Sequence, residues 1–289
     1  MTIKQALSRA RGILGASNIE DASLESELLL RHALKISRVE LYLELDQELN
    51  AQQDKGFRHL IERRLNNEPV AYITGQREFY GLDFYVDPNV LIPRPESELL
   101  VEKALELAQG QAVSTIVEVG TGCGAIAISL ALSLPQAKIY ASDISAAALE
   151  VARFNCQKHE VTDRICLLSG DMLDPLPEPV DLIVANLPYV MEAELSRINT
   201  LNFEPPLALN GGWDGLEKIG RLCTRIGDKL HPGGCLLLEI GQGQGSAVTT
   251  LLRRLFPSAE IEVTPDLSGI DRVVSLALTT ITAKSEIAC

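Results

Sequence analysis

The stretch "NLPY" at residues 186–189 directly follows an apolar run, "VDLIVA", that is typical of a buried strand. Asparagine and proline are unfavourable in strands, so these residues should end the strand and form the loop after it. The side-chain oxygen of Asn186 and the backbone carbonyl of Leu187 can together accept both hydrogens of a planar NH2 group. Pro188 stiffens the loop, and the ring of Tyr189 can stack on a flat amide or base. The stretch is typical of a clamp for such a group, although Asn-x-Pro also marks an ordinary strand exit.

Such a clamp would compensate for the low reactivity of an amide or aromatic amine. The lone pair of a planar nitrogen is delocalised, which makes the nitrogen a poor nucleophile. Carbonyl oxygens that accept both N–H groups draw electron density toward the nitrogen and aim its lone pair at an electrophile. No strong base is required, because the proton can leave after the new bond begins to form. The acceleration would come mainly from positioning and from fixed carbonyl dipoles.

A glycine-rich loop and an acid form a second set of candidate binding residues. In "EVGTGCGAIAISLAL", Gly120, Gly122 and Gly124 lie between a predicted strand and a predicted helix, where they allow a sharp turn and a close approach to a ligand. Asp143 ends the next predicted strand, "KIYASD", and can accept hydrogen bonds from ribose hydroxyls. The combination predicts a nucleoside cofactor. Because Ala125 completes the dinucleotide fingerprint G-x-G-x-x-G/A, loop and acid alone do not separate S-adenosylmethionine from NAD.

Two further acids bear on the identity of the cofactor. Glu118, just before the glycine loop, favours S-adenosylmethionine, because a nearby carboxylate stabilises a positively charged methionine group. In "SGDML", Asp171 could accept a hydrogen bond from an adenine amino group while Met172 covers the ring. Asp171 could equally be an ordinary turn residue.

These candidate residues require a parallel sheet whose strands end at a common edge. Continuous apolar runs predict buried parallel strands at residues 114–120, 138–143, 165–170, 180–185 and 234–241. Helical periodicity lies between most of them, at residues 124–134, 145–157 and 215–230. Two final segments, "AEIEVTPDLSG" and "DRVVSLAL", predict an antiparallel pair at the edge. The pattern predicts a Rossmann-like α/β fold, with a mostly parallel, doubly wound sheet that binds ligands beyond the carboxyl ends of its strands.

The segments before the sheet have a different texture. Residues 1–68 show apolar residues at helical spacing and short polar breaks, which predicts a small helical bundle. In residues 69–95, four aromatic residues around Gly81 in "EFYGLDFY" predict a β-hairpin. The hairpin could simply pack on one domain, or it could also join two domains and help to wall a cleft between them.

Composition and charge narrow the class of protein. The chain has 289 residues and is 46% hydrophobic, which is enough for one large core or two domains. The formal net charge of −13 argues against a nucleic-acid partner, because such proteins usually carry a basic excess. No apolar stretch has the length of a membrane span or signal-peptide core, so we expect a cytoplasmic protein without a membrane partner. The cysteines form no C-x-x-C pair and the histidines no H-E-x-x-H, so no metal is expected.

Several longer segments resemble the HemK/PrmC family of protein-(glutamine-N5) methyltransferases. The resemblance covers nearly the whole chain; it is most specific in "IPRPESE" and "EPPLALNGGWDGL" and extends to "REFYGLDFYV", "LLLEIGQGQG" and "GIDRVV". That family methylates the side-chain amide of the glutamine in the Gly-Gly-Gln tripeptide of class 1 peptide chain release factors. The resemblance implies the same reaction, with S-adenosyl-L-methionine as cofactor and a release factor as protein partner. We expect a monomer that contacts no nucleic acid directly.

The resemblance also implies domains and a role for each candidate residue. The domains are a helical substrate-recognition domain, a β-hairpin linker and an S-adenosylmethionine-dependent methyltransferase domain, at residues 1–70, 71–96 and 97–289. The cofactor would be bound by the glycine loop, the ribose acid, a residue against the adenine and the asparagine of the clamp, which are Gly120, Thr121, Gly122, Cys123, Gly124, Asp143, Met172 and Asn186. The glutamine amide would be bound by Asn186, Leu187, Pro188 and Tyr189. The expected catalytic residues are Asn186, Pro188 and Tyr189.

One position departs from the family pattern, and alternatives stay open. The family usually has Asn-Pro-Pro-Tyr, whereas this chain has Leu187 in the second place, which keeps the carbonyl but loses one restriction on φ. Asn-Leu-Pro-Tyr also resembles the motif of ribosomal RNA adenine N6-dimethyltransferases, against which the acidity, "PRPESE" and the helical N-terminal segment argue. An NAD-dependent oxidoreductase would leave the clamp unexplained, and a nucleotide-binding module without activity would give Asn186 no role.

Overall fold

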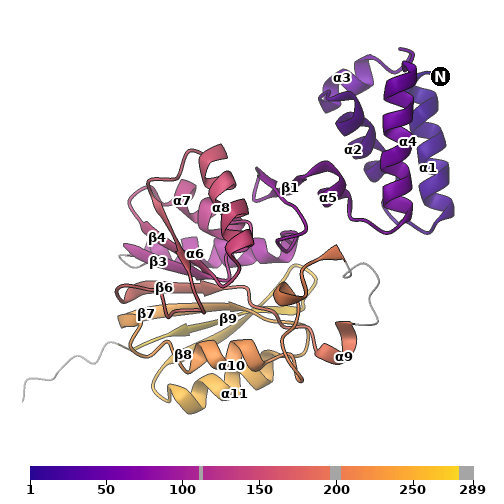
Figure 1. Ribbon diagram of the computed structural model, residues 1–289. Coiled ribbons are helices and arrows are strands. Elements are labelled where there is room, and N and C mark those ends of the chain that lie inside the picture. The colour runs from indigo at the N-terminus through magenta and orange to yellow at the C-terminus, as the bar shows by residue number, and fades with distance from the viewer. Residues whose placement is uncertain (111–112, 196–202, 280–289) are drawn as a thin grey trace, which may run out of the picture. The chain divides into compact units, whose positions relative to one another are not determined.

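The computed structural model describes residues 1–110, 113–195 and 203–279. The chain divides into two compact units, one formed mainly by Met1–Gln76 and a larger one that begins at Arg77. Each unit has its own hydrophobic core, one among the helices of the smaller unit and one around the sheet of the larger unit. Figure 1 shows the elements of both units.

The smaller unit is helical, as the sequence predicts. Its helices are α1 (Ile3–Ala16), α2 (Ala22–Leu34), α3 (Arg38–Leu43), α4 (Ala51–Leu65) and α5 (Val70–Thr74). Capping boxes begin α1, α3 and α4, in which the N-cap side chain and the residue three positions later bond each other's backbone N–H groups. Leucines and isoleucines at helical spacing form the core of this unit.

The predicted β-hairpin is present and is tightly turned. It consists of β1 (Gln76–Phe79) and β2 (Leu82–Tyr85). The connecting residues Tyr80 and Gly81 have φ values of 52° and 70°, and two successive left-handed residues are what a two-residue type I′ turn requires. The glycine at the centre of the aromatic cluster therefore serves the turn.

A buried asparagine fixes the hairpin to the larger unit. The Asn155 side chain accepts a hydrogen bond from the backbone N–H of Tyr85 at 2.8 Å and donates to the backbone carbonyls of Tyr85 and Cys123, each at 2.9 Å. The Phe84 ring lies 5.0 Å from the His159 ring, between centroids. The hairpin thus packs on the sheet domain and is linked to the glycine loop; its role in walling a cleft stays a prediction.

The larger unit is built on a seven-stranded sheet with the strand order β5-β4-β3-β6-β7-β9-β8. The strands are β3 (Thr115–Val119), β4 (Lys138–Asp143), β5 (Ile165–Ser169), β6 (Val180–Ala185), β7 (Leu230–Glu239), β8 (Glu260–Pro265) and β9 (Asp271–Ala277). The strands β3 to β7 run parallel, and β9 pairs antiparallel with both β7 and β8. The predicted fold class is confirmed, with the antiparallel strand one place in from the edge.

Helices cover both faces of this sheet (Figure 1). One face carries α6 (Glu98–Gly110), α7 (Ala125–Ser133) and α8 (Ala146–Lys158), and the other carries α10 (Glu217–Cys223) and α11 (Gly245–Leu255). The shorter elements are α9 (Glu192–Leu195), η1 (Pro95–Ser97) and η3 (Pro206–Ala208). The sequence analysis did not identify α6 and α11, and α10 ends earlier than the predicted helix at residues 215–230.

One acid explains a polar position inside an apolar strand. Asp181, in β6, accepts hydrogen bonds from the backbone N–H groups of Ser114 and Thr115, at 2.8 and 2.9 Å. This contact ties the beginning of β3 to β6 and fixes the level at which their carboxyl ends meet.

Within the part of the chain that the structure describes, no helix is long and apolar enough to cross a bilayer.

Candidate active site

The candidate site is a cavity in the larger unit, at the carboxyl ends of β3, β4, β5 and β6. It brings together residues from the glycine loop, the β4 acid, the "SGDML" turn and the "NLPY" stretch. Those that line it are Gly120, Gly122, Asp143, Asp171, Met172, Asn186 and Leu187. Pro188 also lines the cavity, together with segments around Val90 and Leu207 that the sequence analysis did not assign.

The glycine loop needs its glycines for different reasons. Gly120, Gly122 and Gly124 have φ values of 76°, 55° and 84°, in the left-handed region that other residues avoid. A Cβ atom on Gly120 would lie 3.3 Å from Cδ2 of Leu187, whereas one on Gly122 would meet nothing within 4 Å. Gly120 therefore allows the loop to approach the "NLPY" stretch, and Gly122 leaves open space toward the cavity.

Asp143 orders the glycine loop and also faces the cavity. One carboxylate oxygen accepts from the backbone N–H of Gly122 at 2.9 Å, and the other accepts from the backbone N–H of Ser145 at 2.8 Å. Burial raises the pKa of the Asp143 carboxyl, while these backbone hydrogen bonds act in the opposite direction. An acceptor at the end of β4, beside an open glycine loop, has the position and the chemistry to bind ribose hydroxyls.

Other residues of the loop region support the loop from beneath. The Thr121 hydroxyl donates to Glu118 at 2.5 Å, and the same Glu118 oxygen accepts from the backbone N–H of Ala127 at 3.0 Å. Burial raises the pKa of Glu118 to about 8 and that of Cys123 to about 12. Neither the Glu118 carboxyl nor the Cys123 thiol lines the cavity. Glu118, predicted to favour a cationic ligand, thus holds the loop and the first turn of α7.

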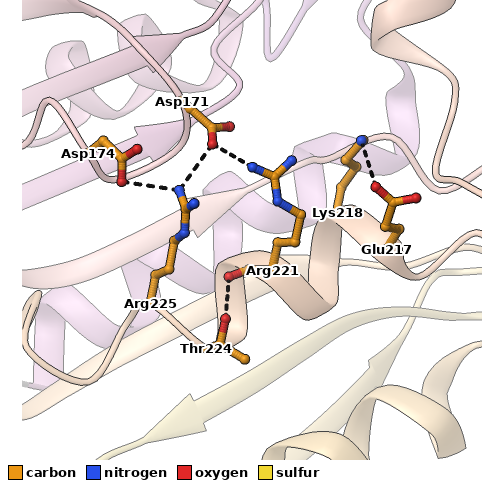
Figure 2. Close-up of polar contacts among 7 residues, drawn as sticks. All are labelled: Asp171, Asp174, Glu217, Lys218, Arg221, Thr224 and Arg225. Atoms are coloured by element: carbon orange, nitrogen blue, oxygen red, sulfur yellow. Dashed lines mark hydrogen bonds and ion pairs between the residues drawn. The ribbon is translucent and has the colours of Figure 1, made fainter.

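The "SGDML" turn contributes two residues to the cavity wall, and one of them, Asp171, also belongs to a charged cluster. Met172 lines the cavity with φ of 53°, and its carbonyl accepts from the Ser142 hydroxyl at 2.8 Å. The carboxylate of Asp171 accepts from Arg221 at 2.6 Å and from Arg225 at 3.1 Å, as Figure 2 shows. Asp171 therefore connects the end of β5 to α10. Both arginines bond Oδ2, and none of the hydrogen bonds found among the described residues engages Oδ1, so a contact of Asp171 with an adenine amino group stays a prediction.

The "NLPY" stretch leaves β6 at the floor of the cavity. Asn186 lines the cavity, and its side-chain nitrogen donates to the hydroxyl of Ser97 at 2.9 Å. The Tyr189 hydroxyl donates to the buried carboxylate of Glu239 at 3.3 Å. Burial and the charge of Glu239 raise the pKa of Tyr189. Tyr189 does not line the cavity, so its packing on a substrate amide stays a prediction.

Two glycine-rich segments, around Gln244 and Gly211, contact the end of the "NLPY" stretch and hold it in place. The side-chain nitrogen of Gln244 donates to the carbonyl of Tyr189 at 3.2 Å. The backbone of Val190 donates to Leu209 at 3.1 Å and accepts from Gly211 at 2.9 Å. A Cβ atom on Gly211 would lie 2.7 Å from the Tyr189 Cα atom, so a glycine is needed for this contact.

A buried acid holds the segment that precedes α6. Glu204 is 3% exposed and accepts from the backbone N–H of Ile92 at 3.0 Å and from Arg94 at 2.5 Å. Sequence reasoning assigned no role to Glu204, Ser97, Glu239 or Gln244. They lie in "EPPLALNGGWDGL", "IPRPESE" and "LLLEIGQGQG", three of the segments that carried the family resemblance. The resemblance therefore marked these segments, but the sequence did not show which contacts their side chains make.

Among the described residues, no group of His, Cys, Asp and Glu side chains is arranged to hold a metal ion.

The fold and the site define a Rossmann-like methyltransferase. Residues 95–203 match the family model described as methyltransferase small domain, and residues 5–75 match the PrmC N-terminal domain. A solved methyltransferase from Pyrococcus furiosus shares the fold at a TM-score of 0.53 and 18% identity, over 75% of this chain and 97% of that one.

Comparison with curated proteins identifies the family. A release factor glutamine methyltransferase from Moorella thermoacetica is 44% identical, over 94% of this chain and 97% of its own length. One from Geobacter sulfurreducens is 39% identical, over 94% and 95%. The chain belongs to the release factor glutamine methyltransferase family, which confirms the resemblance of the sequence to that family.

Proposed function

We propose that this protein transfers the methyl group of S-adenosyl-L-methionine to the side-chain amide nitrogen of the glutamine in the Gly-Gly-Gln motif of class 1 peptide chain release factors. The observation that carries the proposal is the close approach of the glycine loop to the "NLPY" stretch. A Cβ atom on Gly120 would lie 3.6 Å from the backbone carbonyl oxygen of Asn186. A cofactor on the loop and an amide at Asn186 would therefore meet in one cavity.

The described residues fit this cofactor. Asp143 offers a carboxylate to a diol, Gly122 leaves room for close backbone contact, and Met172 presents a polarizable side chain for a flat ring. Thr121 and Cys123 can contribute through their backbone, since their side chains are buried. When bound, S-adenosyl-L-methionine supplies an electrophilic methyl group.

The chain itself would bind and orient the acceptor nitrogen. The Asn186 side-chain oxygen and the Leu187 carbonyl would accept the two N–H groups of the glutamine amide, which turns the nitrogen lone pair toward the methyl donor. Pro188 restricts the loop, and Glu239 holds Tyr189 from behind. Alignment and fixed dipoles would supply most of the acceleration, and the amide proton would leave to solvent.

The partner would be a protein and not a nucleic acid. The net charge of −13 disfavours long-range attraction to RNA, while it does not oppose a protein loop. The helical unit at the N-terminus, which matches the PrmC N-terminal domain, would recognise the release factor. We expect the enzyme to act as a monomer in the cytoplasm.

The test is incubation with labelled S-adenosyl-L-methionine and either a purified class 1 release factor or ribosomal RNA. We expect label on the release factor, and mass spectrometry should map it to the glutamine of Gly-Gly-Gln. Label on ribosomal RNA alone, with activity that falls steeply with added salt, would instead identify an RNA adenine methyltransferase.

A further inference from the structure

One chain of hydrogen bonds joins both ends of the "NLPY" stretch to residues outside it. The Asn186 side-chain nitrogen donates to the Ser97 hydroxyl oxygen at 2.9 Å, and that hydroxyl donates to Oε2 of Glu239 at 2.6 Å. The Tyr189 hydroxyl donates to Oε1 of the same Glu239 at 3.3 Å. A single carboxylate thus holds the first and the last residue of the stretch.

Sheet topology and a short turn place these residues together. Ala185 pairs with Leu238 in the adjacent parallel strands β6 and β7, so Asn186 and Glu239 follow side by side. Ser97 ends η1, a turn that the proline-rich "IPRPESE" segment initiates. Ser97 and Glu239 are only 3% and 1% exposed, so water cannot replace either partner freely.

The order of donors in this chain decides which way the Asn186 carboxamide points. A serine hydroxyl has one hydrogen, and Ser97 gives it to Glu239, so its oxygen can only accept from Asn186. The NH2 group of Asn186 must then face Ser97, which leaves its Oδ1 atom on the other side. None of the hydrogen bonds found among the described residues engages that Oδ1 atom, so it is available as an acceptor in the cavity.

We propose that Ser97 and Glu239 are positioning residues for methyl transfer, which together hold the Asn186 carboxamide with Oδ1 toward the substrate amide. The inference rests on the proposed function, because that function makes Asn186 the acceptor. A carboxamide rotated by half a turn would present its NH2 group to the NH2 group of the substrate, and two donors form no hydrogen bond. An asparagine without a fixed partner would populate both orientations.

The negative charge on Glu239 fixes the direction of donation in the hydrogen bonds from Asn186 to Ser97 and from Ser97 to Glu239. An ionised carboxylate can only accept, whereas a protonated one can donate to Ser97, which could then donate to Oδ1 of Asn186. Burial raises the pKa of Glu239, as does nearby Glu96; hydrogen bonds from Ser97 and Tyr189 and the charge of Arg272 lower it. Turnover should therefore fall on the acid side as Glu239 takes up a proton.

The decisive variants change the Ser97 hydroxyl alone. Ser97→Ala should lower kcat by about 10²-fold, the scale for misplacing a reacting group by a small distance, while the Kd for S-adenosyl-L-methionine stays near the wild-type value. Ser97→Thr keeps the hydroxyl and should restore most of the turnover. Ser129→Ala is the matched control, since it removes another buried hydroxyl, one that bonds within α7, and should leave turnover unchanged.

A second variant tests the direction of hydrogen-bond donation between Ser97 and Glu239. Glu239→Gln can either accept from or donate to Ser97, so its turnover should lie between those of the wild type and Ser97→Ala, and the acid-side fall should disappear from its pH profile. The experiment uses the full chain, a purified release factor and calorimetric titration of the cofactor. Wild-type turnover in Ser97→Ala, or Ser97→Thr as inactive as Ser97→Ala, overturns the inference while the proposed function stands. If the wild type does not methylate a release factor, the proposed function itself fails, and this inference fails with it.

Discussion

The carboxylate of Asp143 accepts a hydrogen bond from the backbone N–H of Gly122 at 2.9 Å, and both residues line the same cavity. The acid that should receive ribose hydroxyls therefore also shapes the glycine loop that the cofactor would contact. Ser145 bonds the second oxygen, so the carboxylate is oriented before any ligand arrives. Pre-orientation of this kind reduces the ordering cost of binding.

Loss of this carboxylate should weaken cofactor binding. Asp143→Ala removes the acceptor for the ribose and releases the Gly122 N–H group, so the binding free energy of S-adenosyl-L-methionine should weaken by about 1.5–3 kcal/mol, the range for hydrogen bonds to charged groups. Calorimetric titration measures the change. Asp163→Ala, at an exposed aspartate, is the control and should bind normally. Equal affinity of the Asp143→Ala variant and the wild type would remove Asp143 from the binding site.

Asn186 should affect turnover and not cofactor affinity. Asn186→Ala removes the side-chain acceptor but leaves Asp143 and the glycine loop in place. Turnover on a release factor should fall by roughly 10²–10³, the scale for one preorganised hydrogen-bonding group at a reacting centre, while the cofactor Kd changes little. Steady-state kinetics together with calorimetry separate the two quantities.

The aspartate variant refines the same prediction. Asn186→Asp still offers oxygen acceptors, so it should retain more activity than the alanine variant unless its charge holds the cofactor unproductively. Near-normal turnover in Asn186→Ala, with normal cofactor binding, would mean that the amide is held elsewhere and that "NLPY" only ends a strand.

Patterns of adjacent residues predicted the fold well, because buried parallel strands and a hairpin turn have local signatures. The apolar run before Asn186 and the glycine after the aromatic residues of the hairpin are examples, since each encodes its own backbone conformation. The amphipathic helices α6 and α11 also have a local pattern and could have been found.

The support of the site could not be predicted in this way. Ser97 precedes Asn186 by 89 residues and Glu239 by 142 along the chain. The pairing of β6 with β7 brings Asn186 next to Glu239, and the separate turn η1 adds Ser97. Likewise, the ion pairs of Asp171 depend on where α10 and the residues just after it place Arg221 and Arg225. Motif spacing located the cavity, whereas the contacts that fix its side chains are non-local.

Glu118 should make the protein less stable as the pH rises. Its pKa is 4.5 in an unfolded chain and about 8 when folded, because burial disfavours the charged form. Between these pH values the folded state binds a proton that the unfolded state has lost. The contribution of Glu118 to the free energy of unfolding is therefore fully present below pH 4.5, and it falls by at most about 1.4 kcal/mol per pH unit up to pH 8. Glu118→Gln should remove this part of the fall.

Denaturant unfolding of the wild type and Glu118→Gln, from pH 5 to 8.5, measures the effect. Glutamine can still accept from Thr121 and Ala127, so the two proteins should be similar at low pH and the variant more stable at high pH. Parallel stability curves for the two proteins would contradict the raised pKa.

Trp213 should report the arrival of the release factor. It is the chain's single tryptophan and is 86% exposed, on a segment whose neighbour Gly215 packs against the carbonyl of Tyr189. A substrate loop that reaches Asn186 should cover this ring and shift its fluorescence emission to shorter wavelength. Trp213→Ala should raise KM for the release factor without changing the cofactor Kd. A release factor that is methylated without any change in emission would place the substrate on another side of the cavity.

Gly211 should be required for the position of the "NLPY" stretch and not for cofactor binding. In Gly211→Ala the added methyl group would lie 2.7 Å from the Cα atom of Tyr189 and 2.8 Å from the carbonyl oxygen of Pro188, distances at which backbone atoms have to move. A small displacement at a reacting centre costs about 10²-fold in rate, so turnover should fall by that order while S-adenosyl-L-methionine still binds. Gly56→Ala is the matched control, because a methyl group there meets nothing within 4 Å inside α4 and should stabilise the helix by about 0.5–1 kcal/mol. Kinetics, cofactor titration and denaturant unfolding of both variants provide the comparison. Full activity in Gly211→Ala would show that the packing of Gly211 on Tyr189 does not set the geometry of Asn186. The hydrogen bonds through Ser97 and Glu239 would then have to set it alone.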